Sequence, residues 1–231
     1  SDKKYLVPFI LITSLFFLWG FARAILDVLN KHFQNALHIS ITQSAMIQVT
    51  TYLGYFLMAI PAGIFINKYG YRRGVVFGLL LFGLGAIFFI PGAWIGSFSA
   101  FLFCLFVIGC GLVFLETAAN PYVTELGARE TATSRLNLSQ SFNGLGSIFA
   151  TFCIGQFLFN DTQQGGNVVI PYAILGILVL AIAVVFSRVD LPEIQHQQTQ
   201  EDKAKGSNIA KLFANHRMFV FGLFALLSYE V

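Results

Sequence analysis

Long apolar stretches separated by short polar segments divide this chain into regions long enough to span a membrane. From Gly74 to Leu115 there is no charged residue over 42 positions, which is room for two helices of about 20 residues joined by a tight turn. The same pattern along the chain predicts six spans and the start of a seventh. We expect the six spans at Pro8–Lys31, Ser44–Ile66, Gly74–Ala93, Ala100–Pro121, Leu136–Leu158 and Val169–Ser187.

A polar segment, Arg188–Asn215, follows the sixth span and is rich in Gln, Lys, Asp and Glu. It has no hydrophobic periodicity, which is typical of a linker. A new apolar run begins at Met218. We therefore predict a six-helix transmembrane domain over residues 1–187, a linker over 188–215 and the start of a seventh helix over 216–231. A second, C-terminal half is expected beyond it.

The composition is that of an integral membrane protein rather than a soluble domain. Hydrophobic residues make up 56% and charged residues 11%, with a mean hydropathy of +0.73, whereas soluble domains carry about 25% charged residues. The net charge of +3 comes from loops, so no nucleic-acid partner is expected. The three cysteines, Cys104, Cys110 and Cys153, all lie in apolar spans, which favours packing roles over a disulfide or a metal site.

The basic residues orient the chain. If the spans alternate in direction, 12 of the 14 Lys and Arg fall in loops on one side of the membrane. The positive-inside rule then places the N-terminus and the linker in the cytoplasm, in what we expect to be a bacterial inner membrane. These 12 residues are Lys3, Lys4, Lys68, Arg72, Arg73, Arg129, Arg135, Arg188, Lys203, Lys205, Lys211 and Arg217.

Two carboxylates, Asp27 and Glu116, lie inside predicted spans. A charged side chain at the centre of a bilayer costs about 2.5–3.5 kcal/mol on insertion scales, so such residues usually pair or face a polar cavity. Six spans, a linker and a seventh span form the layout of half a twelve-helix carrier, built from two inverted three-helix repeats. Each carboxylate lies in the last third of the opening helix of one repeat. We expect both helices to line a central cavity, with the third and sixth spans packed outside.

The two carboxylates differ in their neighbours along the helix. Arg23, Asp27 and Lys31 are spaced by four, so they share one helix face, and a structural ion pair between Arg23 and Asp27 is an alternative to a functional role. Glu116 has no Lys or Arg within 12 positions on either side. A carboxyl without a cation in apolar surroundings readily takes up a proton. We therefore rank Glu116 above Asp27 as the proton-carrying group.

Two further spans carry polar faces suited to a hydroxyl-rich ligand. Amides can donate to and accept from hydroxyls, and an aromatic ring can stack on the C–H face of a pyranose. Hydrogen bonding between helices is the alternative for these residues, and Trp19 could equally be a sugar platform or a packing residue. The fifth-span residues are Asn137, Gln140 and Asn143, at intervals of three, and those of the second span are Gln48, Tyr52 and Tyr55.

The segment Gly63-Ile64-Phe65-Ile66-Asn67-Lys68-Tyr69-Gly70-Tyr71-Arg72-Arg73 resembles the major facilitator signature, G-x-x-x-D-[RK]-x-G-[RK]-[RK]. Asn67 stands where Asp is usual and Tyr71 stands at the first basic position. A loop of this kind locks the inner ends of helices through charge and helix-dipole contacts. A generic basic turn is the alternative. The gating residues expected from the signature are Gly63, Asn67, Lys68, Gly70, Arg72 and Arg73.

A second resemblance is more specific. The run Leu115-Glu116-Thr117-Ala118-Ala119-Asn120-Pro121, the run from Arg135 to Asn143 and Leu15-Phe16-Phe17-Leu18-Trp19-Gly20 with Asp27 are similar to the fucose–galactose–glucose:proton symporter family. The resemblance runs from about Tyr5 to Phe159. It implies an all-α major facilitator fold, with Glu116 and Asp27 at the positions of that family's two functional acids.

The resemblance also implies the function. We expect uptake of a hexose or deoxyhexose such as L-fucose, driven by protons as the coupling ion, with no other cofactor. The substrate-binding residues expected from resemblance and spacing together are Gln140, Asn143, Asn137, Asn120, Gln48, Tyr52, Trp19 and Arg23.

Other functions remain open from the sequence. They include a major facilitator antiporter of another small organic solute and a non-transporting membrane sugar receptor. We find no nucleophile triad, phosphate loop or metal-ligand spacing, so an enzyme is not expected. Glu230 lies within the seventh apolar run and receives no role. The expected partners are a sugar, protons and membrane lipid, with the full-length protein a monomer.

Overall fold

The computed structural model describes residues 3–36, 41–95, 97–160, 169–188 and 221. The chain divides into two units, Ser1–Ile194 and Gln195–Val231. All the described helices lie in the first unit. In the second unit only Phe221 is described, and its backbone is helical. The predicted linker beyond Arg188, the rest of the predicted seventh helix and Glu230 lie outside the described residues.

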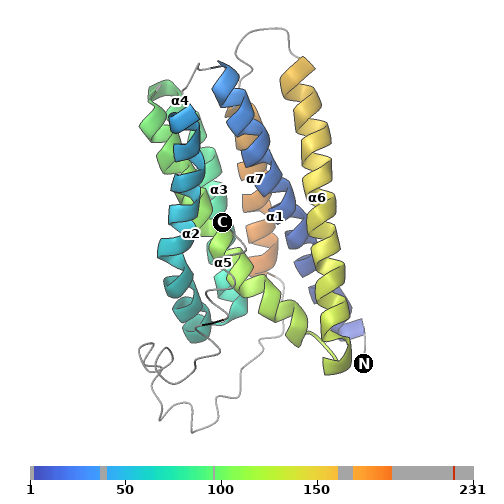
Figure 1. The fold of residues 1–231 in the computed structure, drawn as a ribbon. Coiled ribbons are helices and arrows are strands. Elements are labelled where there is room, and N and C mark those ends of the chain that lie inside the picture. Colours follow the sequence, from blue (N-terminus) through green and yellow to red (C-terminus); the bar gives the residue numbers. More distant parts are fainter. Residues whose placement is uncertain (1–2, 37–40, 96, 161–168, 189–220, 222–231) are drawn as a thin grey trace. The chain divides into compact units, whose positions relative to one another are not determined.

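The first unit is an all-helical bundle (Figure 1). Each of the six predicted spans lies within its helices, which extend further into the loops than the hydropathy pattern indicates. The helices are α1 (Lys3–Ala36), α2 (Ile41–Tyr69), α3 (Tyr71–Ile87), α4 (Phe89–Ile95), α5 (Phe98–Glu125), the short 3-10 helix η1 (Arg129–Thr131), α6 (Ala132–Asn160) and α7 (Val169–Arg188).

The third predicted span, Gly74–Ala93, is divided between α3 and α4 at Phe88. Pro91 explains the division, because it has no N–H to donate to the carbonyl of Ile87 and its ring crowds that carbonyl. The chain nevertheless continues in nearly the same direction, since the Phe88 N–H bonds to the Leu84 carbonyl and the Gly92 N–H to the Phe88 carbonyl. Together the two helices span the distance that the sequence pattern predicts for one.

Among the described residues, four helical stretches are long and apolar enough to cross a membrane: Leu6–Ile25, Ala45–Tyr69, Tyr71–Gly92 and Phe98–Glu125. The stretch Tyr172–Arg188 of α7 is apolar but shorter. In α6 the polar residues on its N-terminal half lower the mean hydropathy, although the helix has 29 residues.

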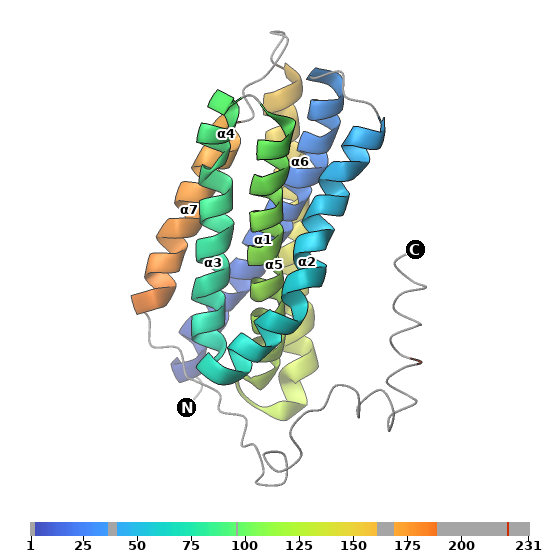
Figure 2. The same cartoon turned by 90° about the vertical axis from the view of Figure 1, so that its left-hand side faces the viewer.

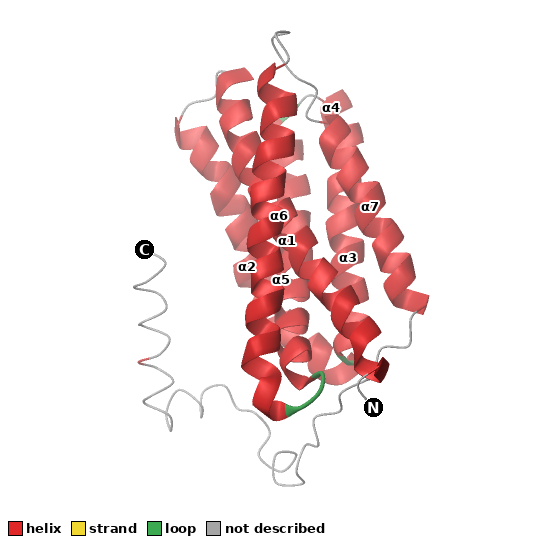
Figure 3. Cartoon of the chain, turned by 90° about the vertical axis from the view of Figure 1, so that its right-hand side faces the viewer, coloured by secondary structure: helices red, strands yellow, loops and turns green. Residues whose placement is uncertain are grey.

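The helices of the two expected repeats exchange partners. The first repeat contains α1, α2 and α3–α4, and the second contains α5, α6 and α7. The opening helix α1 packs mainly on α6, and the other opening helix, α5, packs on α2. Figure 3 shows α6 beside α1, and Figure 2 shows α3 between α7 and α5, with which it packs. Neither repeat could therefore form its contacts alone.

Backbone carbonyls and glycines define the crossing of α1 with α6. A Cβ atom on Gly20 would collide with the carbonyl oxygen of Asn143, and a Cβ atom on Gly146 would collide with the carbonyl oxygen of Phe17. Each glycine thus contacts the carbonyl three residues before the other glycine. Small residues allow such close backbone approach between membrane helices.

The crossing of α2 with α5 has the same arrangement. A Cβ atom on Gly109 would lie 2.5 Å from the Thr51 carbonyl oxygen, and one on Gly54 would lie 2.8 Å from the Phe106 carbonyl oxygen. Again each glycine contacts the carbonyl three residues before the other glycine. We call the two arrangements the glycine crossings. They are equivalent under the exchange of repeats, which is residue-level support for the inverted-repeat architecture expected from the layout.

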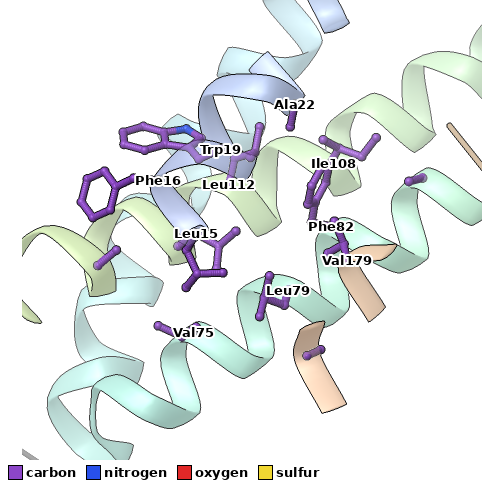
Figure 4. Packing of buried hydrophobic residues seen from close by; sticks show 14 of the residues in the cluster. Leu15, Phe16, Trp19, Ala22, Val75, Leu79, Phe82, Ile108, Leu112 and Val179 are labelled. Atoms are coloured by element: carbon purple, nitrogen blue, oxygen red, sulfur yellow. The ribbon is translucent and has the colours of Figure 1, made fainter. Parts of the chain in front are cut away.

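The apolar core lies between α1, α3, α5 and α7 (Figure 4). The same helices α3 and α7 present large apolar side chains outward, including Leu80, Leu84, Ile174 and Ile177. This fits peripheral helices that face lipid on one side. The labelled core residues in Figure 4 are Leu15, Phe16, Trp19, Ala22, Val75, Leu79, Phe82, Ile108, Leu112 and Val179.

The glycine crossings predict a position-dependent effect of adding one methyl group. We expect Gly109→Ala to lower the melting temperature of the full-length protein in detergent, because overpacking a tight contact costs about 1–3 kcal/mol. Gly63→Ala is the matched control. Gly63 also lies inside a helix, but nothing lies within 4 Å of a Cβ atom placed on it. It should leave the melting temperature unchanged or raise it, since Ala favours a helix over Gly. Equal melting temperatures for the two variants would contradict the crossing.

Candidate functional site

Arg23 and Glu116 lie near each other, although they belong to different helices and to separate predicted groups. The Arg23 Nη2 donates to the Tyr52 hydroxyl at 3.5 Å, a weak bond that joins α1 to α2. Arg23 and Tyr55 both lie within electrostatic interaction range of the Glu116 carboxyl on α5. The rings of Tyr52 and Tyr55 are 6.3 Å apart. Three helices from both repeats therefore meet at one charged cluster.

The cluster continues toward α6. Asn120 lies four residues after Glu116 on α5, so the two share a helix face. The Gln140 Nε2 on α6 donates to the Asn120 Oδ1 at 3.2 Å. Asn137 lies three residues before Gln140 and is exposed. On the other side, Gln48 precedes Tyr52 by four residues and is exposed too.

These neighbours form a continuous band of polar side chains across α2, α1, α5 and α6, which we call the polar strip. Glu116 and Asn120 are half-buried, and the others are exposed on the surface of this unit. The polar strip consists of Gln48, Tyr52, Arg23, Glu116, Asn120, Gln140 and Asn137.

Asn143 has a different position from the other two amides of its predicted trio. It is half-buried, and its Nδ2 donates to the Phe16 carbonyl oxygen at 3.1 Å. Four residues on, the Ser147 Oγ donates to the Gly20 carbonyl oxygen at 3.0 Å. The structure thus brings Asn143 to the α1–α6 crossing. Among the described residues, the bond to Phe16 is the one hydrogen bond that the Asn143 side chain makes.

Other residues of this interface were not identified from the sequence. Thr13 and Ser139 are both buried, and their hydroxyl oxygens are 3.2 Å apart. Ser139, Asn143 and Ser147 recur every four residues on α6. That spacing marks one helix face and could have separated the α1-facing residues from Asn137 and Gln140.

Trp19 is part of the apolar core. Only 8% of its surface is exposed, and its ring makes an edge contact with Phe16 at a centroid distance of 5.9 Å. Its Nε1 is buried without a hydrogen-bond partner among the described residues. The Tyr55 hydroxyl lies close by, in a geometry that falls short of a hydrogen bond. Trp19 therefore packs in the core, which was the alternative to a sugar platform, and its role in substrate binding stays a prediction.

Asp27 lies within α1, one turn beyond Arg23, but its side chain falls outside the described residues, as does that of Lys31. The ion pair considered between Arg23 and Asp27 therefore stays a prediction. What the structure does describe is the bond of Arg23 to Tyr52.

The signature segment is a sharp helix–helix junction rather than a loop. α2 ends at Tyr69 and α3 begins at Tyr71, so Gly70 alone connects them. Its φ of 87° is in the left-handed region that glycine adopts without strain. Gly63, by contrast, has open space around it.

Two basic residues of the signature have distinct contacts. The Arg72 Nη2 donates to the Ser187 carbonyl oxygen at 2.6 Å and its Nε to the Phe186 carbonyl oxygen at 3.4 Å. A cation at the C-terminus of α7 satisfies carbonyls that have no helical partner. Lys68 lies over the Tyr69 ring at 5.2 Å. Asn67 and Arg73 are exposed.

Arg135, which the sequence pattern marks as a loop cation and as part of a family motif, has a comparable role at the end of α5. It donates from Nε to the Val123 carbonyl oxygen at 3.2 Å, from Nη2 to that of Thr124 at 2.8 Å and from Nη1 to that of Ala128 at 2.9 Å. It also bonds to the Thr131 hydroxyl. One guanidinium thus joins the C-terminus of α5, the turn at Gly127 (φ 106°) and α6.

The described residues contain no group of three or more His, Cys, Asp or Glu side chains that could hold a metal ion. Cys104 and Cys110 are buried free thiols and Cys153 is a half-buried one.

Comparison with known proteins gives a consistent result. The Major Facilitator Superfamily profile matches residues 12–229. An L-fucose-proton symporter of Haemophilus influenzae is 37% identical over 223 residues, which cover 85% of this chain and 52% of that protein. A glucose/galactose transporter of Brucella abortus is 35% identical over 238 residues, covering 100% of this chain and 57% of that protein.

A solved structure agrees. The crystal structure of a variant of the E. coli fucose:proton symporter superposes with a TM-score of 0.71 at 39% identity, over 83% of this chain and 51% of that one. This chain spans about half the length of the relatives it matches. The part of those proteins that it matches is their N-terminal six-helix half.

Arg135 provides a test of the helix junction. Arg135→Lys keeps the charge but cannot reach several carbonyls at once. The bonds to the Val123 and Thr124 carbonyls are part-buried. Since an unsatisfied buried acceptor costs about 1–3 kcal/mol, we expect a lower melting temperature for the full-length protein. Arg129→Lys is the control, because Arg129 is exposed in the neighbouring η1. If both variants melted like the wild type, the bonds of Arg135 would not hold the junction.

Proposed function

Because the chain belongs to the Major Facilitator Superfamily, we propose that it is the N-terminal half of a membrane carrier that takes up a sugar together with protons. The proposed substrate is a hexose or deoxyhexose, of which L-fucose is one candidate. Its relatives are transporters rather than enzymes.

The observation that carries this proposal is the exposure of the polar strip on a membrane-spanning bundle. A charged or amide side chain in contact with hydrocarbon is costly, so membrane proteins turn such groups toward protein or a water-filled cavity. In carriers built from repeats, substrate sites lie near the bilayer midplane at the interface between the repeats. The polar strip draws on both repeats, and we assign it to the substrate pathway.

The composition of the polar strip suits a neutral polyhydroxy substrate. Three amides, Gln48, Asn137 and Gln140, are exposed and can both donate and accept hydrogen bonds. Tyr52 adds an exposed ring and a hydroxyl. Relatives named as L-fucose-proton symporters and as glucose/galactose transporters point to the same substrate class.

We assign proton coupling to Glu116, with Asp27 as the second candidate. Glu116 lies within the electrostatic range of both Arg23 and Tyr55. A change in its protonation would therefore alter interactions with α1 and α2 at once. That is what coupling requires, since a proton must change the relative stability of two arrangements of the helices.

We assign gating to the junction at Gly70, where α2 ends and α3 begins next to the C-terminus of α7. Arg72 ties α3 to the C-terminus of α7 through two carbonyls, and such contacts must be kept or broken as a unit when helices move. Following the basic loops, we place this end of the bundle in the cytoplasm of a bacterial inner-membrane protein. The full-length carrier is proposed to act as a monomer.

Glu116→Gln separates coupling from binding. Glutamine keeps a hydrogen-bonding group of nearly the same size but carries no titratable proton. We expect the full-length variant in proteoliposomes to exchange labelled for unlabelled sugar, yet not to concentrate sugar in response to a proton gradient. Glu116→Ala should exchange more slowly, since it also removes the hydrogen-bonding group.

Glu130→Gln is the matched control. Glu130 is exposed in η1 and lies outside the polar strip, so both exchange and accumulation should persist. Accumulation at the wild-type level by Glu116→Gln would remove Glu116 as the proton carrier and leave Asp27. If the wild-type protein neither bound nor exchanged any of the sugars tested, the proposed substrate class would be contradicted.

A further inference from the structure

A cavity of about 380 Å³ lies between α2, α3 and α7, next to the Gly70 junction. Figure 2 shows α3 and α7 at this face of the bundle. None of the lining residues belongs to the polar strip, so this cavity is distinct from the proposed sugar pathway. Its lining consists of Phe65, Arg72, Arg73, Val76, Phe77, Leu80 and Ser187.

The inner part of the cavity is apolar, and its aromatic wall packs against the buried core of the bundle. The Phe65 and Phe77 rings stack with centroids 5.1 Å apart. Both also make edge contacts with the buried Phe114 of α5, at 5.6 Å and 4.9 Å. Phe77 and Leu80 are 38% and 41% exposed, so this wall is open to the surroundings of the bundle. Around a membrane-spanning helix, those surroundings are acyl chains.

The rim of the cavity is cationic. Arg72 is fixed by its bonds to the Phe186 and Ser187 carbonyls. Arg73 is exposed and makes no hydrogen bond to a residue that the structure describes. Arg188 follows Ser187 and is exposed as well. The charged residues of the lining are both basic.

Apolar walls below a basic rim complement an amphiphile with an anionic head. We propose that this cavity binds an anionic phospholipid, with the phosphodiester at Arg73 and the first part of an acyl chain against Phe77 and Leu80. Basic pockets between membrane helices on the cytoplasmic side suit such head groups. The volume is at the lower end of the range for small-molecule pockets, about 300–1,000 Å³, which is enough for the head group but not for a whole lipid.

The tests use the full-length protein, reconstituted in phosphatidylcholine bilayers containing phosphatidylglycerol, and native mass spectrometry of the lipid that stays bound. Arg73→Gln removes the free cation and should reduce retained phosphatidylglycerol about fivefold, the effect of one basic side chain at an anionic surface. Leu80→Trp fills the apolar wall without changing any charge, and it should also reduce retention. Arg129→Gln removes an exposed basic residue that does not line the cavity, and it should retain wild-type levels. Melting temperatures establish that each variant is folded.

A competition experiment distinguishes a lipid from free phosphate. Glycerophosphoglycerol carries the same phosphodiester without acyl chains, so it should not displace the bound phosphatidylglycerol. Displacement would show a phosphate site and overturn the proposal. Equal losses in Arg73→Gln and Arg129→Gln would show only general attraction to an anionic surface. If the wild-type protein retained no more phosphatidylglycerol than phosphatidylcholine, the cavity would not select the anionic lipid and the proposal would be overturned.

Discussion

Close backbone contact at the two glycine crossings is the constraint on which the rest of the bundle depends. Gly20 with Gly146, and Gly109 with Gly54, let α1 approach α6 and α5 approach α2 so closely that a Cβ atom would meet a carbonyl oxygen. Asp27 follows Gly20 by seven residues, and Glu116 follows Gly109 by seven. Seven residues are about two helical turns, or roughly 10 Å. The crossings therefore set where each carboxylate lies along the bundle. Because the repeats are inverted, α1 and α5 run in opposite directions, so Asp27 and Glu116 lie on opposite sides of the level of their crossings.

The polar strip follows from the same exchange of helices. Because the helices of the two repeats interlock, Arg23 of α1 comes within range of Glu116 of α5 in the other repeat. Within the second repeat, the Gln140 amide of α6 donates to Asn120 of α5 and extends the strip. Hydrogen bonds at the crossing use a separate face of α6, through Asn143 and Ser147. One helix thus holds the bundle together on one side and presents amides on another. Exposed amides in a membrane require a polar neighbour, and the relatives that this chain matches are about twice its length.

Much of the fold could be predicted from the sequence, because hydrophobic runs of membrane-spanning length and alternating loop charge determine the spans. The sequence predicted a longer connection at Gly70 than the single residue observed, since hydropathy cannot distinguish a polar helix end from a loop. The candidate site was harder to predict from the sequence. Spacing along one helix predicted a shared polar face for Gln140 and Asn137, which are both exposed. It could not show that Asn143 turns to α1, nor that Arg23 bonds to Tyr52. Those contacts join residues 29 and 127 positions apart, and only the packing of the helices determines them.

Thiol accessibility tests the central claim, that the polar strip faces water within the membrane span. In full-length protein with Cys104, Cys110 and Cys153 replaced by alanine, single cysteines would be placed as Gln48→Cys, Gln140→Cys and Ile177→Cys. Ile177 is 63% exposed on the outer helix α7. We predict that a membrane-impermeant thiol reagent modifies the first two and that sugar slows the modification, whereas the third does not react. Modification of Gln48→Cys and Gln140→Cys no faster than of Ile177→Cys would contradict the account.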